Sequence, residues 1–352
     1  MSLPRVSKIA GSHMQGKIAL EEAVGSPCFF ANATYPPKRL IQDFDGLPFD
    51  PEFVADINKR LDNKDLRLQS MDATGIRHAV VSLTSPGIEG VFDKDLAISF
   101  ATQTNNAIYE TYVKPHPDRF SFFACVALQD PVAAAAELER AVTKLGARGV
   151  LINGFTNLNE ANLDEIRYLD DPLCEPFWAA LARLNIPLYL HPRNPPPSQQ
   201  LLYRSYPSLA QAAFGFGVET AGHALRIMCS GVLDRYPSVQ IILGHCGEAL
   251  PFMIHRVDER MKMAGPGVNG AHQRTLREYL RSNFYATLAG VRCETAFRAT
   301  LQEMGADRVM FSVDYPFESN EEAADWFEEL ELGDELKNRV GWGNAERLLG
   351  LS

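Results

Sequence analysis

The chain has 352 residues, and 34 lysines and arginines against 44 aspartates and glutamates give it a formal net charge of −10. An acidic chain of this kind is a poor candidate for binding nucleic acids or anionic membrane surfaces. Its longest apolar run is too short to cross a bilayer, and its six cysteines contain no Cys-x-x-Cys pair. We therefore expect a cytoplasmic protein with reduced thiols that binds neither nucleic acid nor membrane.

The sequence is expected to form one domain over residues 14–352. Residues 1–13 lack hydrophobic periodicity, and Gly11-Ser12-His13 before Met14 is typical of a vector-derived leader. The remaining length suits a single large α/β barrel.

The first elements are a strand at residues 17–20 and a long loop at residues 25–58 that is rich in aromatic residues and proline. A loop of this kind after a first barrel strand is a functional loop, an apolar cover for the barrel mouth, or both. A helix at residues 60–74 is closed by Gly75, and a second strand covers residues 78–83. Asp93 then caps a helix that runs to about Val113.

The remaining elements continue the alternation of strands and helices. Asp130-Pro131 opens a helix that ends at Gly146, and Gly215 and Gly217 interrupt a helical stretch at residues 208–234. Further strands are predicted at 120–126, 149–152, 186–190, 239–243, 284–287 and 309–312, and further helices at 170–185, 249–263, 272–281, 321–330 and 334–349. Eight strands alternating with helices predict a single (β/α)8 barrel of the TIM type with C-terminal helices.

Four of the predicted strands end in a side chain that can bind a metal or move a proton. These side chains are Glu21, His191 before Pro192, the pair His245 and Glu248, and Asp314. Barrel enzymes keep their chemistry at the carboxyl ends of the strands, so the four positions together predict one polar site.

Each residue taken alone has a second interpretation. Glu21 could be a surface acid, and His191 a core histidine with one hydrogen bond. Asp314 could be a ligand, a proton shuttle or a helix cap. The glycines around His245 could serve turn geometry alone. Arg256, in the following helix, could bind a substrate carboxylate through a bidentate hydrogen bond or be solvated.

Four motifs carry a resemblance to a known family. They are Lys17-Ile-Ala-Leu-Glu-Glu, Tyr189-Leu-His-Pro-Arg-Asn-Pro, Ile242-Leu-Gly-His-Cys-Gly-Glu and Phe311-Ser-Val-Asp-Tyr-Pro-Phe-Glu. Together they resemble the decarboxylase branch of the amidohydrolase superfamily, in particular the γ-resorcylate and 2,3-dihydroxybenzoate decarboxylases. The resemblance covers nearly all of residues 14–352.

The resemblance implies a metal bound by Glu21, His191 and Asp314, with His245 and Glu248 as a catalytic pair. It also implies substrate contacts from a further set: Asn153, Phe216, Arg256 and Phe317. Many family members have Glu-x-His on the first strand, but this chain has Ala23 at the histidine position. Two carboxylates and one imidazole favour Mg²⁺ or Mn²⁺ over Zn²⁺. No G-x-G-x-x-G or P-loop suggests an organic cofactor.

The implied reaction is the non-oxidative decarboxylation of an ortho-hydroxybenzoate, a small aromatic hydroxy acid. We expect 2,3-dihydroxybenzoate as substrate, with salicylate and 2,6-dihydroxybenzoate as the alternatives. Asp314 would protonate the ring carbon that bears the carboxylate, while His245, held by Glu248, moves a second proton. The family also implies a homodimer or homotetramer.

Two other functions stay open at this stage. A hydrolase of the same superfamily would use a metal-bound hydroxide, and the same ligands would serve it. A metal-free, non-catalytic binding barrel is favoured only by Ala23, and the presence of Glu21, His191, His245 and Asp314 argues against it. Product analysis and a metal assay separate the three.

Overall fold

The computed structural model describes residues 13–26, 28, 50–264 and 268–351. Most of the predicted aromatic loop, residues 29–49, lies outside the described residues. In the described ranges, no helix combines the length and the apolar character needed to cross a membrane.

Eight strands form one sheet in which every neighbouring pair is parallel. A parallel bridge between Glu22 and Tyr315 joins the first strand to the segment after the last one, so the sheet closes into the predicted (β/α)8 barrel. In sheet order the strands are β1 (Lys17–Val24), β2 (Ile76–Leu83), β3 (Phe120–Ala124), β4 (Gly149–Asn153), β7 (Leu188–His191), β8 (Ile241–Leu243), β9 (Phe284–Thr287) and β10 (Val309–Met310).

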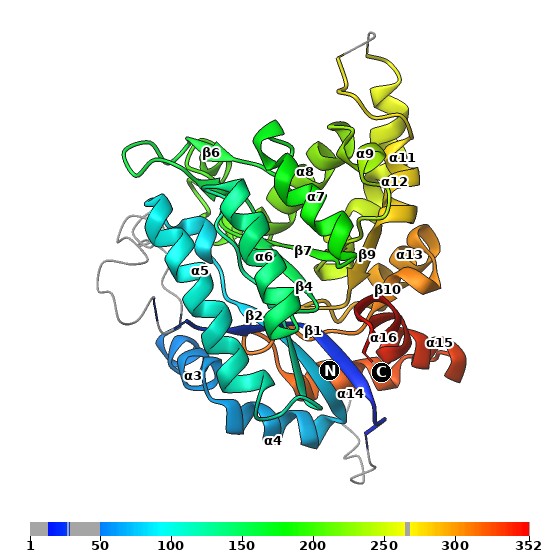
Figure 1. Ribbon diagram of the computed structural model, residues 1–352. Coiled ribbons are helices and arrows are strands. Elements are labelled where there is room, and N and C mark those ends of the chain that lie inside the picture. The colour runs from blue at the N-terminus through cyan, green and yellow to red at the C-terminus, as the bar shows by residue number, and fades with distance from the viewer. Residues whose placement is uncertain (1–12, 27, 29–49, 265–267, 352) are drawn as a thin grey trace.

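The helices lie around the outside of the barrel, as Figure 1 shows. Their bounds are α3 (Pro51–Leu61), α4 (Lys64–Thr74), α5 (Lys94–Ile108), α6 (Pro131–Leu145), α7 (Glu175–Leu184), α8 (Gly215–Cys229), α9 (Val232–Arg235), α10 (His245–Glu248), α11 (Leu250–Met261), α12 (Leu276–Asn283), α13 (Glu294–Met304), α14 (Asn320–Glu329), α15 (Asp334–Asn338) and α16 (Asn344–Leu349). The larger hydrophobic cluster fills the layer between these helices and the sheet.

A second, smaller cluster fills the inside of the barrel. It takes at least one buried side chain from each of the eight strands: Ile18, Leu20, Val80, Phe123, Leu151, Tyr189, Ile242, Tyr285 and Met310. Ala345 and Leu349 of α16 pack against the same cluster. Apolar side chains therefore fill the barrel below the strand ends, and the metal-capable side chains lie above them at its mouth.

Several predicted helix ends are confirmed by their caps. The Asp93 side chain accepts a hydrogen bond from Leu96 N at the start of α5, and Asp130 accepts from two amides at the start of α6. Gly146 ends α6 with φ of 74°, a left-handed conformation that glycine adopts without a steric cost.

The predicted helix at residues 60–74 is wrong at its start. Asn63 accepts a hydrogen bond from Leu66 N, so it caps a new helix, α4, and separates it from α3. Helix α3 falls in the stretch predicted to be loop. Its start, Asp50-Pro51, has the same chemistry as Asp130-Pro131 and could have been recognised.

The helical stretch predicted at residues 208–234 is also divided differently. A 3-10 turn covers Pro207–Ala210, and Gly215 begins α8 instead of interrupting it. A side chain at Gly215 would collide with the backbone of Ala210, which explains the glycine. A short antiparallel pair, β5 (Thr156–Asn157) and β6 (Ile166–Arg167), was not predicted.

Candidate active site

Glu21 points into the barrel because β1 contains an irregularity. The pairing of β1 with β2 shifts register between Ala19 and Glu22, so an extra residue lies in β1 there. The amides of Leu20 and Glu21 both donate to Ser312 Oγ, at 3.0 and 2.8 Å. The predicted strand end at Leu20 is therefore too early, since Glu21 lies inside β1.

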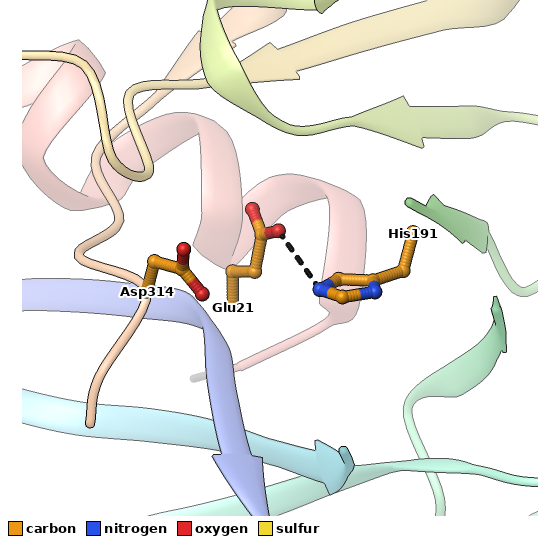
Figure 2. A group of neighbouring side chains, drawn as sticks. All are labelled: Glu21, His191 and Asp314. Atoms are coloured by element: carbon orange, nitrogen blue, oxygen red, sulfur yellow. Dashed lines mark ion pairs between the residues drawn. The ribbon is translucent and has the colours of Figure 1, made fainter. Parts of the chain in front are cut away.

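Glu21, His191 and Asp314 come together at the barrel mouth (Figure 2). One ligand atom from each residue can be chosen so that all three lie within 4.8 Å of one another. Glu21 Oε1 lies 3.3 Å from His191 Nε2. His191 ends β7, as predicted, and Asp314 lies in the loop after β10.

The chemistry of these three side chains suits a divalent cation. Glu21 Oε1 is buried and accepts no hydrogen bond from any described residue. A buried carboxylate oxygen without a partner is costly, and a cation would satisfy it. Two carboxylates and one imidazole can together hold a divalent cation.

His245 and Glu248 form the predicted pair beside this group. His245 Nδ1 lies 2.8 Å from Glu248 Oε1, and its Nε2 lies 3.7 Å from Asp314 Oδ2 and 3.8 Å from Glu21 Oε1. A carboxylate on one ring nitrogen fixes the orientation of the ring and directs the other nitrogen into the site.

Burial and charge set the protonation of the site. Burial raises the pKa of Asp314 to about 7, against the effect of its hydrogen bond with His245. Burial alone would lower the pKa of His245, but the negative charges of Glu248 and Glu21 hold it well above its usual value. Burial lowers the pKa of His191, so its contact with Glu21 joins a neutral imidazole to a carboxylate.

The backbone is strained where these side chains are presented. The φ angles of His245, Glu248 and Asp314 are 50°, 53° and 81°, values that residues other than glycine rarely adopt. Such strain persists only where the surrounding structure holds it, and it is concentrated at functional sites.

Glu22 points away from the site and pairs with a buried arginine. Its carboxylate lies 3.9 Å from Arg67 Nη1, and both side chains are almost fully buried. Arg67 also lies over the ring of Tyr315. This pair ties the end of β1 to the loop that carries Asp314.

The four predicted substrate-binding residues differ in how far they are buried. Asn153 is buried at the end of β4, where it is the register partner of His191. Phe216 is half-buried in α8, and Phe317 is 41% exposed, three residues beyond Asp314. Arg256 is exposed on α11, and within the described residues its guanidinium has no hydrogen bond or ion pair. Its expected contact with substrate stays a prediction.

Three buried hydroxyl groups near the site were not predicted. They belong to Ser312, Tyr189 and Thr287, and each hydroxyl lies close to Glu21. Tyr189 precedes His191 by two residues, so the alternation of a strand places both on the inner face of β7. That signal was present in the sequence. Each of these hydroxyls contacts Glu21, which is far away in the sequence, so no local pattern predicts the contact.

The comparisons with known proteins agree with this arrangement. An amidohydrolase family model matches residues 62–351. A γ-resorcylate decarboxylase from Rhizobium sp. is 40% identical over 341 residues, 96% of this chain and 99% of the relative. The chain belongs to the amidohydrolase family and, within it, groups with the aromatic-acid decarboxylases. The predicted family and the predicted enzyme class, a carboxy-lyase, are confirmed.

Solved structures extend the likeness to the whole fold. A dihydroxybenzoic acid decarboxylase from Polaromonas sp., with bound manganese and the inhibitor 2-nitroresorcinol, has a TM-score of 0.87 at 37% identity and covers 96% of this chain and 98% of that one. A 5-carboxyvanillate decarboxylase from Novosphingobium aromaticivorans, also with manganese, has a TM-score of 0.88 at 33% identity and covers 98% and 100%. Two solved structures that share this fold, at 37% and 33% identity, therefore contain a divalent metal, manganese.

Proposed function

We propose that this protein catalyses the metal-dependent, non-oxidative decarboxylation of ortho-hydroxybenzoates. The observation that carries the proposal is the group Glu21, His191 and Asp314 at the barrel mouth, with His245 Nε2 3.7 Å from Asp314 Oδ2 beside it. Glu21, His191 and Asp314 would hold Mn²⁺ or Mg²⁺. A divalent cation held there would supply Lewis-acid stabilisation of the substrate phenolate.

Asp314 is the group that protonates the ring. Loss of CO2 needs a proton on the ring carbon that bears the carboxylate, and the Asp314 carboxyl group, at the barrel mouth beside His245, can deliver it. His245, held through Nδ1 by Glu248, can pass protons within the site. Its Nε2, 3.7 Å from Asp314 Oδ2, can return a proton to Asp314 after turnover.

The names of the similar proteins change which candidate substrate we rank first. The Rhizobium relative is named for γ-resorcylate, which is 2,6-dihydroxybenzoate, and the Novosphingobium structure for 5-carboxyvanillate. Both acids carry a hydroxyl ortho to the carboxylate that is lost. We therefore place 2,6-dihydroxybenzoate ahead of the 2,3-isomer that the sequence first suggested. The cytoplasmic location and the homo-oligomeric state stay predictions.

The test is product analysis with a matched substrate control. Enzyme loaded with Mn²⁺ is incubated with 2,6-dihydroxybenzoate, 2,3-dihydroxybenzoate, salicylate and 5-carboxyvanillate, and the decarboxylated phenols are followed by chromatography. 3-Hydroxybenzoate has no ortho hydroxyl and should not react. Product from at least one ortho-hydroxybenzoate supports the proposal. Bound metal without product from any of them would reject it and favour a hydrolase.

A further inference from the structure

The two oxygens of the Glu21 carboxylate have different surroundings. Oε2 accepts a hydrogen bond from the Tyr189 hydroxyl and lies 3.4 Å from Thr287 Oγ1. Oε1 has no hydrogen bond from the described residues and lies 3.3 Å from His191 Nε2. Oε2 is thus held by two protein hydroxyls, whereas Oε1 faces His191, one of the other predicted metal ligands.

The two hydroxyls are rigidly placed. Tyr189 and Thr287 are both fully buried, and their hydroxyl oxygens lie 3.0 Å apart. They come from β7 and β9, so Glu21 of β1 is held from two other strands of the barrel. A Cβ at Gly244 would lie 2.7 Å from Glu21 Oε2, so the glycine leaves the room that this oxygen needs.

We propose that Tyr189 and Thr287 are positioning residues that fix the Glu21 carboxylate so that it binds the metal through Oε1 alone. This inference rests on the proposed function, because it requires a metal at the site. It matters in this chain because Ala23 offers no second ligand from β1. The affinity for metal then depends on how firmly the remaining Glu21 oxygen is aimed. Hydrogen bonds to a ligating carboxylate of this kind commonly change metal affinity by about 10- to 100-fold.

Tyr189→Phe tests the inference, since it removes the hydroxyl and keeps the buried ring. Metal-free protein is titrated with Mn²⁺, and free Mn²⁺ is measured by electron paramagnetic resonance. The dissociation constant should rise by about 10- to 100-fold. Tyr285→Phe is the matched control, because Tyr285 belongs to the same interior cluster but its hydroxyl has no hydrogen bond among the described residues. Its Mn²⁺ affinity should equal that of the parent.

A second pair of variants keeps the test decisive if Tyr189→Phe does not fold. Thr287→Val should weaken Mn²⁺ binding, and Thr287→Ser, which keeps the hydroxyl, should restore it. Circular dichroism confirms that each variant is folded. A parent that binds Mn²⁺ and decarboxylates, with folded Tyr189→Phe and Thr287→Val binding equally well, would reject the positioning role and leave the function intact. A parent that binds no divalent metal would reject both.

Discussion

At the scale of single residues, the backbone at Asp314 explains how its carboxylate reaches the site. A φ of 81° at a residue other than glycine costs about 1–3 kcal/mol. The buried neighbours Val313 and Tyr315 hold the segment on either side. The strain turns the carboxylate toward His245, and Gly290 makes room, since a Cβ there would lie 3.1 Å from His245 Cδ2.

Asp314→Asn should abolish turnover while the substrate still binds. The amide keeps the shape of the side chain and one oxygen, but it cannot deliver a proton. We expect kcat to fall at least about 100-fold. Steady-state kinetics on the best ortho-hydroxybenzoate measure the loss, and calorimetry on the Mn²⁺-loaded variant measures substrate binding.

Glu322→Gln is the control for that variant. Glu322 is an exposed acid of α14 that pairs with Arg292, so its loss should leave kcat nearly unchanged. Near-normal turnover by Asp314→Asn would show that Asp314 is not the acid.

At the scale of elements, the end of β7 was predictable, but the end of β1 and the direction of its side chains were not. The apolar run before His191-Pro192 marks both the end of β7 and a buried imidazole. In β1, strict alternation from Ile18 and Leu20, which face the barrel interior, would turn Glu22 inward. The register shift turns Glu21 inward instead. Ser312, two residues beyond the end of β10, accepts hydrogen bonds from the amides of Leu20 and Glu21 where the register shifts, and no local pattern in β1 reveals this contact.

The hydroxyls around Glu21 were missed for the same physical reason. The alternation of β7 indicates that Tyr189 faces inward, but the partner of a buried serine, threonine or tyrosine hydroxyl depends on which strand lies opposite. Metal-capable side chains are different, since a carboxylate or imidazole at the end of an apolar run needs a partner wherever it is buried.

Ser312→Ala should destabilise the protein through β1. It leaves the buried amides of Leu20 and Glu21 without their shared acceptor, at about 1–3 kcal/mol for each unsatisfied group. Urea unfolding of metal-free protein should show a loss of about 2–6 kcal/mol in the free energy of unfolding. Ser121→Ala, which removes a single hydrogen bond with His78, should cost only about 1 kcal/mol. Equal costs for the two variants would contradict the special role of Ser312.

At the scale of the whole molecule, the outer helices are joined to the barrel loops by buried polar contacts as well as by apolar packing. His223 of α8 is one example. It is 1% exposed, and its Nε2 accepts a hydrogen bond from Leu169 N at 2.9 Å. Burial, reinforced by the charge of Arg226, lowers the pKa of His223 to about 3.

This histidine should make the fold sensitive to acid. In the unfolded chain its pKa returns to about 6.5, so below that pH the unfolded state binds a proton that the folded state does not. The stabilising contribution is therefore complete above pH 6.5 and is lost as the pH falls toward 3. Between pH 6.5 and about 3, protonation of this one histidine lowers the free energy of unfolding by about 1.4 kcal/mol per pH unit.

His223→Gln separates this contribution from those of other titrating groups. The glutamine amide oxygen can still accept from Leu169 N, but the side chain no longer titrates. Urea unfolding between about pH 4 and 6 should therefore show a free energy that falls less steeply than in the parent, by about 1.4 kcal/mol per pH unit. His255→Gln, at an exposed position on α11, should keep the parent slope. Parallel slopes for the parent and His223→Gln would mean that the buried imidazole takes up its proton without unfolding, and that α8 opens locally in acid.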